Sequence, residues 1–328
     1  MRTLSLFAVG ALGLVFSGQL RADSLEQWLV RMDHAVASIS YRGTLVITGS
    51  DRIDTMRVLH RVDDYGVRER IYALDGPPRE VVRVGDQVRC LISGQASVIV
   101  DNPFPTRLLP RIPLNEILGP DSVYRVELVG TGRVAAREAR IMQILPLDEY
   151  RYGRRLWLDN DTGMLLRSVV FGPGGEIVEK LSFVEIELGA AIADAELQSA
   201  LENPSQVTRY QIANQKDSEF ASSKTPLWLP ESLPKGFRLT SVGHGGGSDQ
   251  RYEHLLFSDG LSSFSIYVEF DRRTRVTEQV ESRGAMHIYT GSIDGNMVTV
   301  VGEVPAPTVR LIGRHLRRLQ APGLRQID

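Results

Sequence analysis

The chain has 328 residues, a length that accommodates two domains of ordinary size. Hydrophobic residues make up 42% of the sequence and charged residues 24%, which is typical of globular proteins and excludes a largely disordered chain. The formal net charge of −2 excludes a generally basic protein, so we expect no nucleic acid partner.

The first 22 residues have the pattern of an export signal peptide. Arg2 precedes an apolar run that ends at Phe16, and a small residue follows where cleavage can occur. The run is too short to span a bilayer comfortably, although an uncleaved anchor is the alternative. The chain's one cysteine, Cys90, lies far from this run, so we expect no lipoprotein anchor. The pattern predicts an exported, soluble protein that begins near residue 23.

An amphipathic helix opens the mature chain. Ser24 and Gln27 match a capping box, in which each side chain accepts a hydrogen bond from the other residue's backbone N–H. Trp28, Leu29 and Met32 then recur at the spacing of one helix face. This face needs a partner in the core.

From residue 41 the hydrophobic period changes to two, which predicts strands. Turn motifs rich in Gly, Asp and Pro separate them, and they lie near residues 41–48, 54–62, 67–74, 79–84, 87–92, 97–100, 123–130, 133–145, 151–158, 164–171 and 176–188. So long an antiparallel meander has to curl. We therefore expect residues 23–203 to form a half-barrel around the first helix, with a short closing helix near residues 194–201.

Residues 103–120 are interrupted by prolines yet remain apolar. They form either a loop that packs on the core or a lid over an opening in the half-barrel. A half-barrel that its helix fills only in part leaves an apolar cavity able to take an acyl chain. The candidate lining and lid residues are Trp28, Leu29, Met32, Phe104, Leu108 and Leu109.

Residues 204–226 are polar and aperiodic, which indicates a linker. Residues 227–328 then predict a smaller α+β domain. Its strands lie near residues 237–242, 253–258, 262–269, 285–290 and 296–301, and a helix over residues 307–319 ends it.

The last helix is basic and amphipathic. Such a helix either packs with a solvated arginine face or contacts an acidic partner. Residues 23–203 hold 21 basic and 27 acidic residues, a net charge of −6, whereas residues 225–328 hold 12 and 11, a net charge of +1. The second domain is therefore the better candidate for binding an acidic partner. Its candidate contact residues are Arg310, Arg314, Arg317 and Arg318.

No pattern in the sequence predicts catalysis. Gly243-His244-Gly245-Gly246-Gly247 resembles an oxyanion loop of some esterases, but no G-x-S-x-G nucleophile turn accompanies it. The six histidines lack metal-ligand spacing and there is one cysteine. We expect neither an enzyme nor a bound metal or cofactor.

Several short motifs, in a fixed order along nearly the whole mature chain, resemble the MucB/RseB family of periplasmic regulators of an envelope-stress sigma factor. The motifs are His60-Arg61-Val62, Arg68-Glu69-Arg70, Arg79-Glu80-Val81-Val82-Arg83, Tyr150-Arg151-Tyr152-Gly153, Leu158-Asp159-Asn160-Asp161-Thr162-Gly163, Trp228-Leu229-Pro230, Leu233-Pro234-Lys235-Gly236-Phe237, Ser258-Asp259-Gly260-Leu261 and Val298-Thr299-Val300-Val301-Gly302-Glu303-Val304-Pro305.

The resemblance implies a first domain like the lipoprotein carriers LolA and LolB, a half-open barrel around a helix. It also implies a second domain that binds the periplasmic part of a membrane-spanning anti-sigma factor, RseA or MucA. Binding shields that factor from the site-1 protease, and a lipid or lipopolysaccharide signal releases it. The alternative function is a periplasmic lipid or lipoprotein carrier. The sequence leaves a homo-oligomer open.

Overall fold

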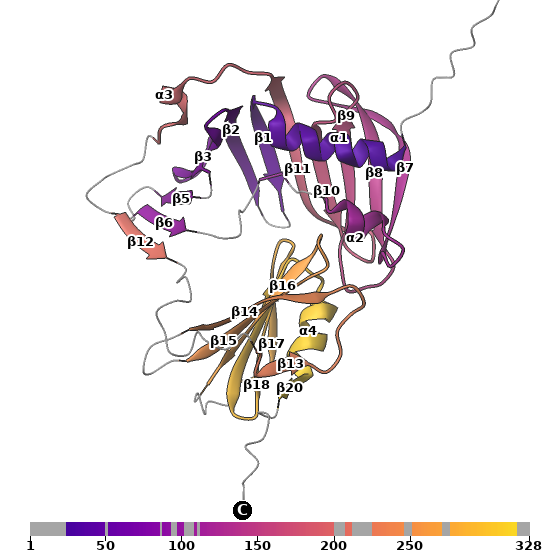
Figure 1. Cartoon of the computed structure of the whole chain (residues 1–328), viewed down its shortest axis with the longest axis vertical. Coiled ribbons are helices and arrows are strands. Elements are labelled where there is room, and N and C mark those ends of the chain that lie inside the picture. The colour runs from indigo at the N-terminus through magenta and orange to yellow at the C-terminus, as the bar shows by residue number, and fades with distance from the viewer. Residues whose placement is uncertain are drawn as a thin grey trace, which may run out of the picture.

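The first domain is built on one twelve-stranded sheet that curls around a helix (Figure 1). The structure, a computed structural model, describes residues 24–49, 52–85, 87–92, 97–101, 108–109, 112–199, 207–211, 225–245, 251–270 and 276–319. The strand order is β12-β6-β5-β4-β3-β2-β1-β11-β10-β9-β8-β7, so β12 and β7 are the two free edges and the sheet is an open half-barrel. This confirms the predicted fold of the domain.

Most strands of this sheet lie where the alternating pattern predicts them. They are β1 (Tyr41–Thr48), β2 (Ile53–Asp63), β3 (Gly66–Ala73), β4 (Arg79–Val84), β5 (Gln87–Ile92), β6 (Ser97–Asp101), β7 (Tyr124–Val134), β8 (Arg137–Pro146), β9 (Gly153–Asp159), β10 (Leu165–Phe171), β11 (Ile177–Leu188) and β12 (Val207–Gln211). The strands from β1 to β6 and those from β7 to β11 form two antiparallel meanders, which β1 and β11 join by antiparallel pairing, whereas β12 runs parallel to β6.

Helix α1 (Leu25–Ser38) lies across one face of the sheet (Figure 1). Its predicted capping box is present: the Gln27 N–H donates to Ser24 Oγ at 3.2 Å, and the Ser24 N–H donates to Gln27 Oε1 at 2.7 Å. The buried face of α1 joins the inward side chains of β1, β2, β8, β9 and β10 in one core. Burial of this face holds the helix in the half-barrel.

The hairpin between β7 and β8 differs from the prediction. The strands predicted near residues 123–130 and 133–145 leave the turn at residues 131–132, and that boundary is wrong. The strands continue to a two-residue turn at Ala135 and Ala136, whose φ angles of 48° and 61° lie in the left-handed region. A two-residue hairpin turn of this type matches the twist of the strands, and the fold imposes it on two alanines.

Three short elements complete the first domain. Helix α2 (Leu114–Leu118) precedes β7 and lies between it and α1. Helix α3 (Asp194–Leu197) is shorter than the predicted helix, and it packs near β3. Strand β12 falls within the segment predicted as a linker, so part of that segment is a strand of the first sheet.

The second domain is a six-stranded antiparallel sheet with one helix on it. The order is β14-β15-β16-β19-β18-β17, and α4 (Ala306–Arg314) packs on β17, β18 and β19. A core that includes Trp228, Phe264 and Ile312 fills the space between them. The strands are β14 (Arg238–Gly245), β15 (Tyr252–Ser258), β16 (Ser263–Glu269), β17 (Gln279–Arg283), β18 (Met286–Ile293) and β19 (Asn296–Gly302). The predicted smaller α+β domain is confirmed.

The C-terminal helix is shorter than predicted. Its pattern was expected to continue to residue 319, but α4 ends at Arg314, and β20 (Leu316–Arg318) pairs antiparallel with β13 (Trp228–Pro230). Leu316 is buried in the domain core from the strand rather than from a helix. The prediction is wrong because Leu316 and Leu319 fit a helical period, while the pairing partner lies about 90 residues earlier in the chain.

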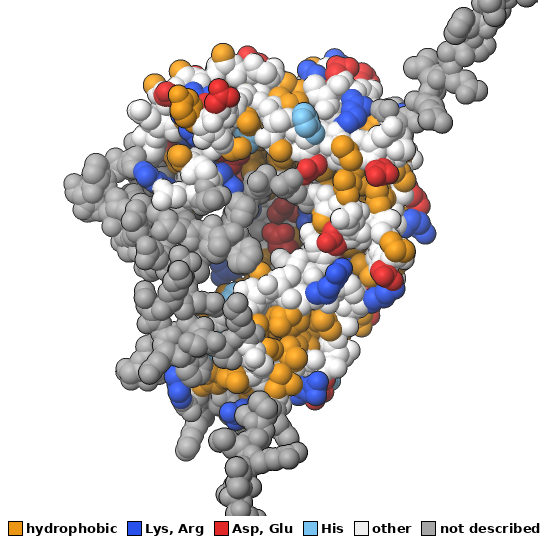
Figure 2. Space-filling view, in the orientation of Figure 1, with side chains coloured by type: hydrophobic (Ala, Val, Ile, Leu, Met, Phe, Trp, Pro, Cys, Tyr) orange, Lys and Arg blue, Asp and Glu red, His pale blue; other side chains and the backbone are white. Residues whose placement is uncertain are grey.

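The two domains meet at the end of the half-barrel that carries α2 and β7 (Figure 1). In the space-filling view, acidic side chains lie in the recess between the two halves, and hydrophobic side chains gather on the second domain (Figure 2). The predicted signal peptide, Phe104 and the side chain of Cys90 lie outside the described residues.

Candidate functional site

The residues expected to line a lipid cavity meet in the core of the first domain. Trp28, Leu29 and Met32 are buried there, and Leu109 belongs to the same cluster with 2% of its surface exposed. Leu108 is partly buried against this cluster. The described part of the proline-rich stretch thus packs on the core, and a cavity among these side chains stays a prediction.

A surface pocket of about 420 Å³ opens at the seam between the domains. Its lining comprises Asp33 of α1, residues 112–116 and Gly260 of the second domain. Two of these groups are carboxyl side chains, Asp33 and Glu116, so the pocket does not suit an acyl chain. Its importance is its position, since α1, α2 and the second domain all reach it.

The four candidate arginines are exposed on the second domain, but they belong to two elements. Arg310 and Arg314 lie one turn apart on α4, whereas Arg317 and Arg318 lie on β20. Arg314 binds Glu278 through two nitrogens, with Nη2–Oε1 at 2.6 Å and Nε–Oε1 at 2.9 Å. The other three form no ion pair with any described residue, so their charges are available to a partner.

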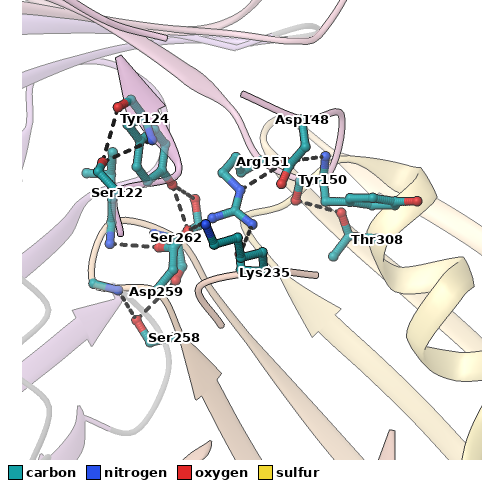
Figure 3. Close-up of polar contacts among 12 residues, drawn as sticks. Ser122, Tyr124, Asp148, Tyr150, Arg151, Lys235, Ser258, Asp259, Ser262 and Thr308 are labelled. Carbon is teal, nitrogen blue, oxygen red and sulfur yellow. Dashed lines mark hydrogen bonds and ion pairs between the residues drawn. The ribbon is translucent and has the colours of Figure 1, made fainter. Parts of the chain in front are cut away.

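A buried arginine joins the two domains. Arg151, in the loop between β8 and β9, has no exposed side-chain surface (Figure 3). Its Nη1 donates to Asp259 Oδ2 at 2.7 Å, its Nη2 to the carbonyl of Lys235 at 2.7 Å, and its Nε to Asp148 at 3.0 Å. Two of these three acceptors belong to the second domain. Arg151 is the central polar contact of the junction.

Asp259 is equally well satisfied. Its Oδ2 also accepts the hydroxyl of Tyr124 at 2.8 Å, and its Oδ1 accepts the backbone N–H groups of Leu261 and Ser262 at 2.9 and 2.7 Å (Figure 3). Burial, and then the charge of Asp259, raise the pKa of Tyr124 well above its ordinary value, so the phenol stays a donor. A buried ion pair is tolerated when its remaining hydrogen-bonding capacity is filled, as here.

A second set of contacts lies on either side of this ion pair. The hydroxyl of Thr308, in α4, donates to the carbonyl of Tyr150 at 2.7 Å (Figure 3). The hydroxyl of Tyr152 lies 3.1 Å from Nδ1 of His287, and the same nitrogen lies 2.9 Å from the carbonyl of Val304. Only a protonated Nδ1 can donate to that carbonyl, which fixes the ring's tautomer.

The sequence predicted none of these junction roles. Arg151 and Asp259 each lie in a motif that carried the family resemblance, but 108 positions separate them and each motif is a plain turn between strands. The signal that was available is the clustering of an arginine between two tyrosines in a loop. The first domain's concave face also holds a buried His60–Glu69 pair, 3.0 Å between Nδ1 and Oε2, which the sequence did not indicate.

The described residues offer neither a metal centre nor a membrane-spanning helix. They contain no group of three or more His, Cys, Asp or Glu side chains placed to hold a metal ion. None of the helices in this part of the chain has the length and apolar character needed to cross a membrane.

Comparison with known proteins gives full-length matches. The family profile described as the MucB/RseB N-terminal domain matches residues 24–201, and that of the MucB/RseB C-terminal domain matches residues 222–317. The chain is 33% identical to the sigma factor AlgU regulatory protein MucB of Pseudomonas aeruginosa, over 97% of this chain and 98% of that protein. It is 24% identical to the sigma-E factor regulatory protein RseB of Escherichia coli K12, over 93% and 94%.

A solved structure is similar across both domains. The crystal structure of MucB in complex with MucA(peri) superposes with a TM-score of 0.72 and 30% sequence identity. The match covers 91% of this chain and all of that one.

Proposed function

The chain belongs to the MucB/RseB family, and from this we propose that it is a periplasmic regulatory protein, not an enzyme, that binds the periplasmic segment of a membrane-spanning anti-sigma factor. While bound, it shields that segment from the first proteolytic cleavage, so the sigma factor stays sequestered. A lipid or lipopolysaccharide signal releases it. The half-barrel domain receives the signal, and the second domain, residues 227–328, binds the partner.

One observation carries this proposal. A structure that resembles the chain over 91% of its length is that of a MucB protein bound to MucA(peri), and the similarity includes both domains. A relative that shared one domain alone would not support a partner-binding role so directly. The match in order and extent supports a common architecture, and with it a common class of partner.

The charge distribution supports contact through the second domain. Arg310, Arg317 and Arg318 are exposed and have no carboxylate within ion-pair distance among the described residues. Charges of this kind steer an oppositely charged partner and fix its register more than they add raw affinity. We therefore expect an acidic stretch in the bound segment.

The half-barrel supports a lipid signal. Its helix and its inward strands form one apolar core, to which Leu108 and Leu109 also belong. Burying ten methylenes of an acyl chain at about 0.8 kcal/mol each gives about 8 kcal/mol before ordering costs, which corresponds to micromolar affinity as an upper bound. A lipid releases the partner only if it binds the partner-free conformation better than the bound one.

A lipid or lipoprotein carrier is the second candidate function. The half-barrel around a helix favours it. It leaves the second domain, and the buried junction that holds it, without a role. A carrier would not retain an anti-sigma fragment, so the two functions separate in one experiment.

That experiment is a titration of the mature protein with the periplasmic fragment of the anti-sigma factor, by calorimetry, with and without lipopolysaccharide. The proposal expects saturable binding that weakens as lipopolysaccharide is added. It also expects slower cleavage of the bound fragment by the site-1 protease. Absence of binding, with retention of lipid, would replace the proposal with the carrier function.

A further inference from the structure

One turn of the second domain reaches into the first domain. The turn between β15 and β16, residues 258–262, contains Asp259, which binds Arg151 and Tyr124. Two residues on, Leu261 packs against the core cluster of the first domain, to which the buried face of α1 also belongs. No other feature of the second domain combines a buried ion pair with entry into that core among the described residues.

Helix α2 lies directly on this turn. Gly260 has a φ angle of +96°, and a Cβ atom placed on it would lie 2.8 Å from Cγ of Pro113 and 3.1 Å from Cγ of Glu116. The backbone of the turn and the start of α2 are thus in van der Waals contact with no room for a methyl group. The seam pocket described above lies at this contact.

The other side of α2 faces the interior of the half-barrel. Ile112 and Ile117 are 4% and 1% exposed, and they share a core with Trp28, Met32 and Leu109. Trp28, Met32 and Leu109 are among the side chains expected near a bound acyl chain. A change in the filling of that core is therefore transmitted to α2, because close-packed side chains transmit a displacement.

The turn also leads into the centre of the second domain. Phe257 and Phe264, which flank it on β15 and β16, stack with ring centroids 5.3 Å apart. Both lie in the core that supports Val309 and Ile312 of α4. The helix that presents Arg310 thus belongs to the same core as the two rings that flank the turn.

We propose that the 258–262 turn couples the two domains: the position of α2 sets the position of the turn, and the turn sets the packing beneath α4. The inference rests on the proposed function, since it supplies the route by which the interior of the half-barrel influences the partner-binding domain. The coupling is reciprocal, so partner binding changes the stability of α2 by the same factor that α2 changes partner affinity.

Hydrogen exchange with and without the anti-sigma fragment tests this in the full mature chain. The reporters are the N–H groups of Ile117 and Gly119, which donate within α2 to Pro113 and Asn115. The fragment is expected to change their exchange rates about fivefold or more in the parent protein. In Gly260→Ala the change is lost, because the methyl group separates the turn from α2, while the fragment still binds.

Gly295→Ala is the matched control. Gly295 also lies in a hairpin turn of the second domain with a positive φ, +79°, but nothing lies within 4 Å of an added Cβ. Gly295→Ala has a similar conformational cost in the backbone but disturbs no contact with α2. Binding of the fragment should therefore change hydrogen exchange at α2 in this variant as it does in the parent. Leu261→Ala removes the packing on the first-domain core without adding strain, and it should behave like Gly260→Ala; it decides the matter if Gly260→Ala fails to fold.

The outcomes separate cleanly. A parent protein that does not bind the fragment overturns the proposed function and this inference with it. A parent that binds, with no change at α2, overturns the inference alone. Equal changes at α2 in Gly260→Ala, Leu261→Ala and Gly295→Ala also overturn it. Loss in the first two and retention in the third supports it.

Discussion

Arg151 of the first domain and Asp259 of the second form an ion pair, 2.7 Å between Nη1 and Oδ2, in which neither side chain is more than 1% exposed. The carboxylate accepts three further hydrogen bonds and the guanidinium donates two. Removal of either partner leaves an unpaired buried charge, which is far more costly than the loss of an exposed ion pair. The junction is therefore a structural element of the molecule and not a loose contact.

Arg151→Met should destabilise the protein strongly. Breaking a buried pair by removing one partner typically costs about 3–5 kcal/mol, and here the loss falls on the contact between domains. Denaturant unfolding followed by tryptophan fluorescence should show a lower midpoint, or two transitions where the parent has one. Arg314→Met is the control, because it removes an exposed ion pair with Glu278 and should leave the midpoint nearly unchanged. Equal midpoints for the two variants would contradict the prediction.

Acidification should weaken the junction through His287. Burial lowers the pKa of His287, and its hydrogen bond to the carbonyl of Val304 only partly offsets this. The folded protein then binds fewer protons than the unfolded chain near its unfolded pKa of about 6.5, so stability falls as the pH drops through that value.

His287→Gln removes the titrating group. Between about pH 7.5 and 5.5 its free energy of unfolding should fall less than that of the parent, in matched urea titrations. His34→Gln, on the exposed side of α1, serves as the control for the loss of a histidine elsewhere. Parallel pH profiles for the parent and His287→Gln would rule out this role.

Ala136→Gly should stabilise the first domain. Ala136 is exposed and has a φ angle of 61°, a left-handed conformation that costs an L-residue about 1–2 kcal/mol and glycine almost nothing. Glycine also gives the unfolded chain more conformational entropy, which offsets part of this gain. The net increase in the free energy of unfolding is therefore expected to be below about 1 kcal/mol. The thermal midpoint should rise. Ala73→Gly, within β3, should lower it, because no strain is relieved there.

Combined replacement of Arg310, Arg317 and Arg318 by Gln should weaken binding of the anti-sigma fragment about tenfold at low salt, and less at high salt. The loss should appear mainly in the association rate, measured by surface plasmon resonance. Arg314→Gln should have a smaller effect, because Glu278 already neutralises that charge. Arg238→Gln, exposed at the start of β14, controls for the loss of one charge in Arg314→Gln. Unchanged association in the triple variant would remove these arginines from the interface.

The sequence predicted the first sheet well because its turns carry their own signals. The Asn160-Asp161-Thr162-Gly163 turn has a glycine with a φ of +80°, and Asp159 accepts hydrogen bonds from the Thr162 N–H and hydroxyl. Residues of this kind favour a turn in any context. Ala135 and Ala136 carry no such signal, since alanine disfavours the conformation that the hairpin imposes. The hydrophobic period was correct there and the boundary was wrong.

The features that the sequence did not predict depend on contacts between segments far apart in the chain. Strand β20 exists because β13 offers it a partner, and the two are about 90 residues apart. Arg151 and Asp259 meet only because two domains dock. The arginines of the second domain were identified from their charge, a local property, whereas the element that carries Arg317 and Arg318 was set by tertiary pairing. Charge and turn propensity could be predicted from the sequence because they are local properties. Contacts between segments far apart in the chain could not.

The pairing of β13 with β20 has a consequence for the architecture of the second domain. Trp228 lies opposite Arg318, and the Leu319 N–H donates to the carbonyl of Leu227 at 2.7 Å, so the domain's first and last described strands are neighbours. A domain whose two ends lie close together tolerates insertion into another chain. It also tolerates circular permutation with a short connection between its original ends. The second domain is thus a self-contained unit. It is attached to the half-barrel through the buried junction of Arg151 and Asp259 as well as through the chain that leads into it.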